Sequence, residues 1–319
     1  MSTLKFSVVI CTYNRAQLVR ECLPTVLKQA FDPAQYEVIV VDNNSSDNVR
    51  EVVAQMQTAY PNLHYFFEGT QGLSHARNHG WRVAKGRYVA YLDDECKVPV
   101  DWLTHAGRII EQHAPLLLGG DMATFFIDPP PDWWRDAYTK SFYNTHGGEA
   151  RWLINESGLF GGNMFFLRDA LAAVDGFDPS YGMNGDKIYY GEEDELIRRL
   201  KQRFPDRLPY YDPQLCVSHV VRLDKLSLTW PYREIVGRET TYHALFRTGQ
   251  PYLSRADGVR FQLYASKEIV WQIAQSFLYR DKQHYPYWQN HFYENEVLRG
   301  IAATWGHLQA HRELNSWKQ

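Results

Sequence analysis

The first third of the chain alternates between short apolar runs and longer stretches with apolar side chains at helical spacing. Short runs rich in Val and Ile, bounded by polar residues, are typical of buried strands. Strands that alternate with helices favour a parallel sheet covered on both faces. The expected fold class is therefore α/β, with a mostly parallel, Rossmann-like sheet sandwiched by helices. The predicted strands are residues 6–11, 37–41, 64–67 and 88–92, with helices at 18–27, 49–59 and 72–85.

Three polar clusters directly follow three of the predicted strands: residues 12–14, 42–47 and 93–95. In an open sheet of parallel strands, ligands bind beyond the carboxyl ends of the strands. We therefore expect the three clusters to lie together and to form a site for a polar ligand.

The third cluster contains three adjacent carboxylates, Asp93, Asp94 and Glu95. These like charges repel one another unless a cation neutralises them, and oxygen ligands suit hard divalent ions such as Mg²⁺ or Mn²⁺. A metal ion held in this way usually also holds phosphate oxygens. The alternative is a solvated acidic loop, which is the usual reason for a run of charges.

The regular alternation breaks off between residues 119 and 156. Three consecutive prolines before Trp133 and Trp134 predict a surface excursion without regular secondary structure, often functional when it carries aromatic residues. A further strand is predicted at residues 164–167.

The acidic run at residues 191–195 begins a predicted amphipathic helix, and a last strand, residues 214–221, carries His219. Acidic residues in a first turn also complement the helix dipole, so a capping role is an alternative for them. Beyond the last strand, helical patterns rich in Trp, Tyr, Arg and His dominate. We therefore expect two regions, residues 1–222 and a helical region of residues 223–319.

Composition narrows the class of protein. The chain of 319 residues is 45% hydrophobic and 22% charged, which predicts a folded core. A net charge of −3, without a basic run, argues against broad binding to nucleic acid. The four cysteines form no C-x-x-C pair, so a zinc site is not expected. Neither a signal-peptide pattern nor a run of about 18 apolar residues is found, so the expected location is the cytoplasm, with free thiols.

Five motifs, taken in their order along the chain, carry a family resemblance. They are Ser7–Arg15 (SVVICTYNR), Val40–Asp47 (VVDNNSSD), Ala76–Gly86 with Tyr91–Glu95 (YLDDE), Gly162-Asn163, and Gly176–Asp178 with Gly191–Glu193. The segment from about residue 5 to residue 222 resembles glycosyltransferase family 2, the inverting sugar transferases of GT-A fold. The resemblance implies a GT-A-type sheet followed by a C-terminal helical extension.

The resemblance also implies roles for the polar clusters. Residues 12–14 would line a nucleotide pocket, Asp42 would bind the base, and Arg77 would approach the diphosphate or hold the acidic loop. The residues assigned to nucleotide binding are Thr12, Tyr13, Asn14, Arg15, Asp42, Asn44, Arg77, Asp93 and Asp94.

The implied cofactor is Mn²⁺ or Mg²⁺, with Asp94, Glu95 and His219 as its ligands; an ordinary core histidine is the alternative for His219. The family's usual metal motif ends in Asp, and Glu95 offers a carboxylate on a longer side chain. The residues assigned to the acceptor are Gly162, Asn163, Trp133 and Trp134, and burial against the domain is the alternative for the Trp pair.

The catalytic base of the family is an acidic residue in a Gly-Glu-Asp-type motif. Alignment on Glu195-Leu196 places Glu193 at this position, with Asp194 as second candidate. Glu192 would orient the base or raise its pKa by repulsion between like charges.

The function that follows is inverting, metal-dependent transfer of a sugar from a nucleotide-diphosphate donor, expected to be a UDP-sugar. The acceptor is a hydroxyl of a glycan or of a lipid-linked molecule, in the synthesis of polysaccharide or glycoconjugates. The main alternative is an inactive nucleotide-sugar-binding or scaffold protein. A glycoside hydrolase needs no nucleotide pocket, and a nucleotidyltransferase would need a Gly-rich basic loop near the N-terminus. Two arrangements are expected as alternatives for the C-terminal helices. They either lie on a membrane surface as a peripheral contact, or pack as a helical subdomain or homodimer contact.

Overall fold

The computed structural model places the chain in two compact units. The first unit comprises residues 1–125, 143–185 and 192–220, and the second comprises residues 126–142, 186–191 and 221–319. The predicted boundary after residue 222 stays a prediction. The structure describes residues 4–135, 138, 148–154, 159, 161–185, 190–227, 229–246, 255–278, 281, 283–294, 299–306 and 309.

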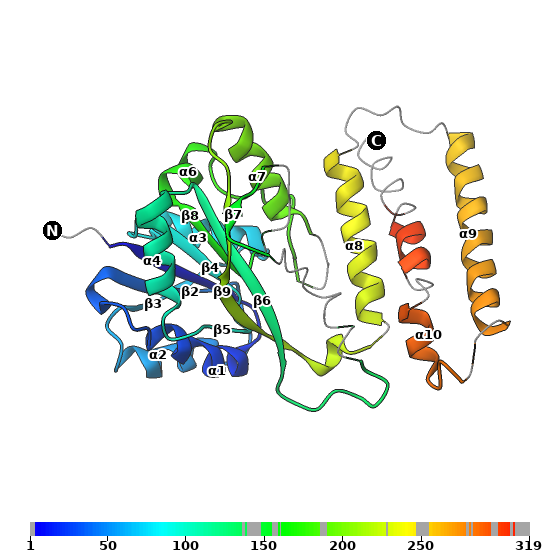
Figure 1. Cartoon of the computed structure of the whole chain (residues 1–319), viewed down its shortest axis with the longest axis horizontal. Helices are drawn as coiled ribbons and strands as arrows, with labels where there is room; N and C mark the ends of the chain where they lie inside the picture. Colours follow the sequence, from blue (N-terminus) through cyan, green and yellow to red (C-terminus); the bar gives the residue numbers. More distant parts are fainter. Residues whose placement is uncertain are drawn as a thin grey trace. The chain divides into compact units, whose positions relative to one another are not determined.

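A single mixed sheet forms the centre of the first unit (Figure 1). Its strand order is β3-β2-β1-β4-β8-β6-β9-β5, and β7 pairs with β9. Strands β1 to β4 pair in parallel, as predicted, whereas β8 pairs antiparallel with both β4 and β6. The antiparallel half begins where the alternation of strands and helices in the sequence ends. The strands are β1 (Phe6–Thr12), β2 (Tyr36–Asp42), β3 (Leu63–Phe67), β4 (Tyr88–Leu92), β5 (Cys96–Lys97), β6 (Leu117–Phe126), β7 (Arg151–Trp152), β8 (Asn163–Leu167) and β9 (Tyr210–Val221).

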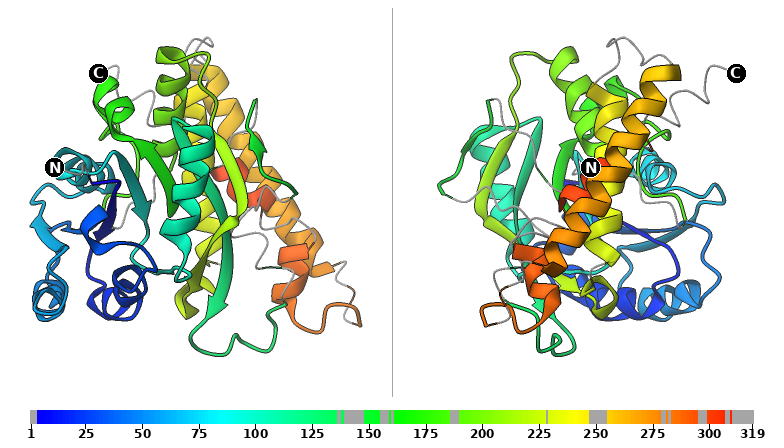
Figure 2. Two further views of the ribbon diagram at one scale, coloured as in Figure 1. Left: turned by 60° about the vertical axis from the view of Figure 1, so that its left-hand side comes forward. Right: turned by 90° about the vertical axis from the view of Figure 1, so that its right-hand side faces the viewer.

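Helices cover both faces of this sheet, as two further views show (Figure 2). On one face α1 (Ala16–Leu27), α2 (Val49–Gln57) and α4 (Trp102–His113) pack against one set of strand residues. On the other face α3 (Leu73–Val83), α6 (Arg168–Ala173) and α7 (Glu192–Arg203) pack against the alternate set.

The two faces explain why the strands read as continuous apolar runs. Successive strand side chains point to opposite faces, so Val8 and Ile10 join one core cluster and Val9 joins the other. Strand β4 is buried along its whole length. A strand with helices on both faces has no side left for polar residues, and its polar positions are therefore confined to its ends.

The second unit is mainly helical in its described residues, with α8 (Thr229–Phe246), α9 (Arg255–Leu278) and α10 (Trp288–Glu294). The Trp pair of the excursion belongs to this unit. Trp134 is buried and packs edge-on against Tyr138 at a centroid distance of 5.5 Å. The amide of Asn290 donates to the carbonyl of Trp133 at 2.6 Å and to the Tyr138 hydroxyl at 2.7 Å. These contacts support the burial alternative for the Trp pair over stacking on a sugar.

None of the helices in the described part of the chain is long and apolar enough to cross a membrane.

Candidate active site

Asp94, in the loop after β4, is hydrogen-bonded to two residues at or just after the carboxyl end of β1. The hydroxyl of Thr12 donates to Asp94 Oδ2 at 2.7 Å, and the guanidinium of Arg15 donates to Asp94 Oδ1 at 2.8 Å. The buried negative charge of Asp94 raises the pKa of Arg15 further above its usual value, although burial of the guanidinium opposes this shift. Both oxygens of Asp94 are thus used to join the first loop to the acidic loop.

The end of β2 joins the same edge. Asp42 accepts the Ser45 N–H at 2.9 Å and the Tyr65 hydroxyl at 2.7 Å, which shapes the loop after β2. Asn14 accepts from the Ser46 N–H at 2.7 Å and so connects the loops after β1 and β2. The three polar clusters therefore lie together, as predicted. Asn14 and Asn44 both have φ values in the left-handed region, 52° and 65°, which asparagine tolerates better than most residues. Tyr13 is 38% exposed beside them.

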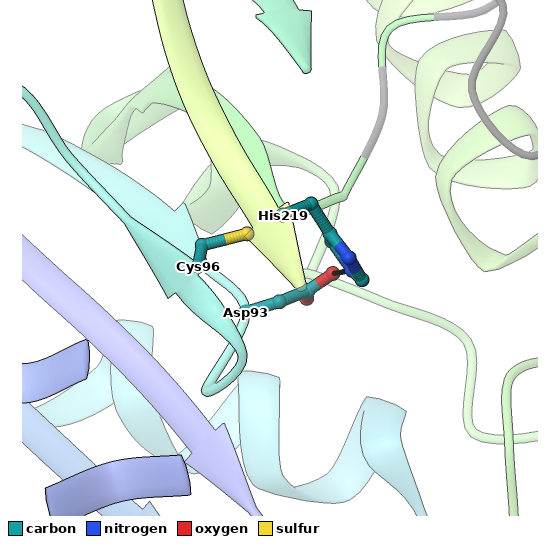
Figure 3. Close-up of side chains that lie close together, drawn as sticks. All are labelled: Asp93, Cys96 and His219. Carbon is teal, nitrogen blue, oxygen red and sulfur yellow. Dashed lines mark ion pairs between the residues drawn. The ribbon is translucent and has the colours of Figure 1, made fainter. Parts of the chain in front are cut away.

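Asp93, Cys96 and His219 form a compact group of metal-ligand types (Figure 3). One potential ligand atom from each of the three side chains lies within 4.8 Å of the other two. His219 Nε2 also lies 3.2 Å from Glu95 Oε1 and 3.7 Å from Asp93 Oδ2. Asp93 is partly exposed, whereas Glu95, Cys96 and His219 are buried.

The chemistry of this group fits a divalent cation. His219 Nδ1 lies 2.9 Å from the carbonyl oxygen of Val220, and a carbonyl oxygen only accepts, so Nδ1 carries a hydrogen. Nε2 of the neutral ring then presents its lone pair to the carboxylates of Asp93 and Glu95. Three electron-rich atoms that converge in this way require a proton or a cation between them. Without a cation, a proton on Nε2 meets this requirement: burial raises the pKa of the Asp93 carboxyl, but the hydrogen bond and positive charge of His219, with the charge of Arg77, outweigh burial and lower it.

The predicted metal ligands are thus placed differently from one another. Glu95 and His219 come together, whereas Asp94 is bonded to Thr12 and Arg15, so its position does not support a metal-binding role. Asp93, which is predicted to bind the nucleotide, lies beside Cys96 and His219.

Spacing along the chain does not point to Cys96 as a candidate ligand. The cysteine lies directly opposite His219 in the antiparallel β5–β9 pair, and no local motif contains both residues. Its position next to the acidic triplet was the available signal.

A second carboxylate group is built around Arg77, a buried residue of α3. Its Nη1 atom donates to Glu192 Oε1 at 3.0 Å and to Glu193 Oε1 at 2.9 Å, both in the first turn of α7. The guanidinium lies over the Phe177 and Tyr91 rings at 5.2 and 5.8 Å from their centroids. Arg77 therefore holds the start of α7 to α3, whereas its predicted role is to approach the diphosphate or to hold the acidic loop of residues 93–95.

The two glutamates bound to Arg77 are not equivalent. Burial, followed by the charge of Glu193, raises the pKa of Glu192 to about 8, although Arg77 opposes the shift. Glu192 is therefore mainly protonated at neutral pH. The Glu193 side chain is 20% exposed and that of Glu192 only 5%. Asp194 is exposed at the next position of the helix.

The backbone at Gly161 and Gly162 runs between the two groups. A Cβ atom on Gly161 would lie 2.0 Å from Glu193 Oε1 and 2.3 Å from Arg77 Nη2, and one on Gly162 would lie 2.5 Å from Asp93 Oδ2. Both positions need glycine because carboxylate oxygens approach the backbone so closely. The group around Arg77 and the group that contains Asp93 thus border the same two-residue segment.

Asn163, the other predicted acceptor residue of this motif, is fully buried. Its amide donates to the carbonyls of Asp121 and Leu215 at 3.0 and 2.6 Å, and its Oδ1 accepts from the Trp102 indole at 3.2 Å. These bonds support a role in joining β8 to its neighbours rather than contact with an acceptor.

Known proteins are similar to this chain in sequence and in fold. The family model "Glycosyl transferase family 2" matches residues 7–174, more than half of the chain. Glycosyltransferase AglE of Haloferax volcanii is 39% identical over 123 residues, which cover 38% of this chain and 40% of AglE. Glucosyl-dolichyl phosphate glucuronosyltransferase of the same organism is 26% identical over 232 residues, 71% of this chain and 72% of that protein.

A solved structure agrees with the fold over the whole chain. The mannosyltransferase PcManGT of Pyrobaculum calidifontis, in complex with GDP-Man and Mn²⁺, has a TM-score of 0.63 at 19% identity. The similarity covers 100% of this chain and 89% of PcManGT. This confirms the predicted GT-A fold. The family model and the fold agree, and the chain belongs to glycosyltransferase family 2.

Proposed function

We propose that the chain transfers a sugar, with inversion, from a nucleotide-diphosphate donor to an acceptor hydroxyl and that the reaction depends on a divalent metal ion. The observation that carries this proposal is the meeting of two chemically different groups at Gly161 and Gly162. One group combines Asp93 and Glu95 with His219, and the other holds Glu193 beside Arg77. Inverting transfer needs both a cation at the leaving diphosphate and a base at the acceptor.

The loops after β1 and β2 are the proposed nucleotide pocket. Asn14 and Ser46 join these loops, and Asp42 fixes the second of them through Ser45 and Tyr65. Such a pre-formed wall orients a base and ribose without ordering cost at the moment of binding. UDP remains the predicted nucleotide, with GDP the other nucleotide to test.

Asp93, Glu95 and His219 are the proposed holders of Mn²⁺ or Mg²⁺. A divalent ion bound there would neutralise the charge that develops on the leaving diphosphate. Arg15 lies 3.8 Å from Glu95 Oε2 and offsets part of the negative charge of the acidic loop.

Glu193 is the proposed base. It accepts the proton of the acceptor hydroxyl at its Oε atoms as that hydroxyl attacks the sugar. Arg77 binds the same carboxylate and fixes its orientation, and Glu192, being mainly protonated, leaves the negative charge on Glu193.

A lipid-linked acceptor is supported by the exposed face of α9. Leu263, Tyr264, Val270, Trp271 and Leu278 are each more than half exposed. These residues recur at intervals of seven and eight positions, about two helical turns, which places them on one side of the helix. Among the described charged side chains of α9, Arg260 and Lys267 are exposed and Glu268 is partly exposed. An apolar face that also presents two basic residues fits the surface of an anionic bilayer, so we propose a peripheral contact there.

The proposed function is tested by nucleotide release. The metal-stripped protein is incubated with UDP- and GDP-sugars and with glycan or polyprenyl-phosphate acceptors, with and without Mn²⁺. The expected result is acceptor-dependent release of the nucleoside diphosphate from one donor, only with metal. Binding of nucleotide without turnover of any donor would instead identify an inactive nucleotide-sugar-binding protein.

A further inference from the structure

The sulfur of Cys96 lies among the atoms that we propose as metal ligands. Cys96 and His219 are direct partners in the antiparallel β5–β9 pair, so their side chains lie on the same face of the sheet. The N–H of Cys96 donates to the carbonyl of Asp93 at 3.0 Å, and this tight turn brings Asp93 back beside the cysteine. Figure 3 shows all three side chains converging from the loop after β4, from β5 and from the end of β9.

We propose that Cys96 is a ligand of the divalent ion, with Asp93, Glu95 and His219, and that its sulfur makes the site prefer softer ions over Mg²⁺. The inference rests on the proposed function only in that both place a divalent ion at this site. The thiol binds as a thiolate and releases its proton to solvent when the metal enters.

The geometry makes sulfur available to a metal. The candidate ligand atoms of Asp93, Cys96 and His219 all lie within 4.8 Å of one another, so an ion among them can reach each one. The Nδ1 hydrogen of His219 is held by the Val220 carbonyl, and this bond directs Nε2 into the same space. A histidine fixed through its other nitrogen is the usual arrangement of a metal-binding imidazole.

The chemistry of a mixed oxygen, nitrogen and sulfur site has a defined consequence. Thiolate and imidazole suit Zn²⁺, Co²⁺ and Cd²⁺, and they are tolerated by Mn²⁺, whereas Mg²⁺ demands oxygen ligands in a strict octahedron. A site that contains Cys96 and His219 therefore disfavours Mg²⁺ relative to one built of carboxylates alone.

The competing explanation is that Cys96 is a buried core residue whose thiol does not bind metal. Cys96 is 0% exposed and belongs to the same core cluster as Leu92 and Val98. Buried cysteines often behave as small apolar residues. That explanation predicts that removal of the sulfur leaves metal binding unchanged.

Cobalt spectroscopy separates the two explanations without any measurement of sugar transfer. The chelator-stripped full-length protein is titrated with Co²⁺, and the near-ultraviolet charge-transfer band of a Co²⁺–thiolate bond is recorded. We expect the band in the native protein, its loss in Cys96→Ser and Cys96→Ala, and its retention in Cys22→Ala. Cys22 is the matched control because it is also a buried thiol, on α1.

The affinity measurements give the expected size of the effect. Cys96→Ser should weaken Cd²⁺ and Zn²⁺ binding by at least the ~10–100-fold that loss of an outer-sphere partner causes. Its Mg²⁺ affinity should change little. If the variants do not fold, X-ray absorption of the Zn²⁺-loaded native protein decides, because a Zn–S distance of about 2.3 Å is diagnostic.

Two outcomes overturn the inference: no thiolate band in the native protein, or an undiminished band in Cys96→Ala. Metal-dependent transfer with equal activity in Mg²⁺ and Mn²⁺, together with no thiolate band, would retain the proposed function and remove the thiolate ligand.

Discussion

The buried guanidinium of Arg77 donates hydrogen bonds to two carboxylates, Glu192 and Glu193, in the first turn of α7. The guanidinium and the two glutamates are neutral together when one glutamate is ionised and the other holds a proton. Glu192 is the more buried of the two and carries the raised pKa, so the less buried partner, Glu193, keeps the negative charge that pairs with Arg77 and has some access to solvent. The division of roles between adjacent residues thus follows from burial.

The first prediction concerns Glu193. Glu193→Gln should lower turnover by about 10²–10⁴-fold, the typical contribution of a general base, while nucleotide binding is retained. Single-turnover kinetics and calorimetry with the nucleoside diphosphate measure the two effects separately. Asp194→Asn is the control, since Asp194 is exposed at the next position, and it should keep near-normal turnover. The reverse result would assign the base to Asp194.

The second prediction concerns pH and Glu192. Its folded-state pKa of about 8 lies above the usual 4.5, so the stability that its protonation contributes is complete below pH 4.5 and is lost as the pH rises through about 8. The Glu192→Gln variant has no ionisable group at this position. The difference between its free energy of unfolding and that of the native protein should therefore shift in favour of the variant as the pH rises from 5 to 9.

Urea unfolding at both pH values measures this difference. The exposed Glu51→Gln of α2 should show no such change. A Glu192→Gln difference that is independent of pH would show that Glu192 ionises normally in the folded protein.

At the scale of elements, two short segments bring the chemistry together. Strand β5 has only two residues, but its pairing with β9 places Cys96 opposite His219. The segment before β8 presents two glycines whose missing side chains leave room for Glu193, Arg77 and Asp93. The first segment acts through strand pairing, which places two distant side chains opposite each other. The second acts through its missing side chains, which allow charged groups to approach the backbone closely.

The third prediction concerns the segment before β8. Gly161→Ala should displace Glu193 and the guanidinium of Arg77, because its Cβ atom would overlap both. We expect a loss of turnover of at least about tenfold, since small displacements of catalytic groups have large effects on rate. Steady-state kinetics measure the loss, and near-ultraviolet circular dichroism confirms the fold.

Gly69→Ala is the matched control. Its Cβ atom would meet only the Phe67 ring, at an ordinary 3.5 Å, and its activity should be unchanged. Equal activity of both variants would contradict the placement of Glu193 beside Gly161.

At the scale of the whole molecule, the two compact units contribute different properties. The first contains both carboxylate groups and the proposed nucleotide loops, and its sheet explains their meeting. The second contains the Trp pair, of which Trp134 is buried, and α9, on which five apolar side chains are more than half exposed. The proposed chemistry belongs to the first unit, and the proposed surface attachment belongs to the second.

The fourth prediction tests this attachment. The full-length protein should float with vesicles of anionic lipid, less well with neutral lipid, and more weakly at high salt. The double variant Leu263→Glu/Trp271→Glu should lose flotation, because both residues are more than half exposed and acquire charges repelled by the surface.

The exposed Ser266→Glu of the same helix is the control and should retain most binding. Concentration-dependent dimerisation without flotation, abolished by the same double variant, would show that this apolar face contacts a second copy instead.

The sequence by itself determined the parallel half of the fold and the meeting of its polar loops. Apolar runs such as residues 6–11 and 88–92 identify strands locally, and parallel strands necessarily end at one edge. The pairing of Asp94 with Thr12 and Arg15 is one result of that rule. Family motifs added Glu95, His219 and the acidic start of α7.

Only the tertiary structure decided which side chains share a site. The Cys96–His219 pair depends on antiparallel register between distant segments, and register leaves no trace in local periodicity. The contact of Arg77 with Glu192 and Glu193 depends on how two helices pack on one sheet face. Strand identity is a local property of the chain, whereas ligand sets and charge pairs arise from long-range contacts, which the folded backbone alone specifies.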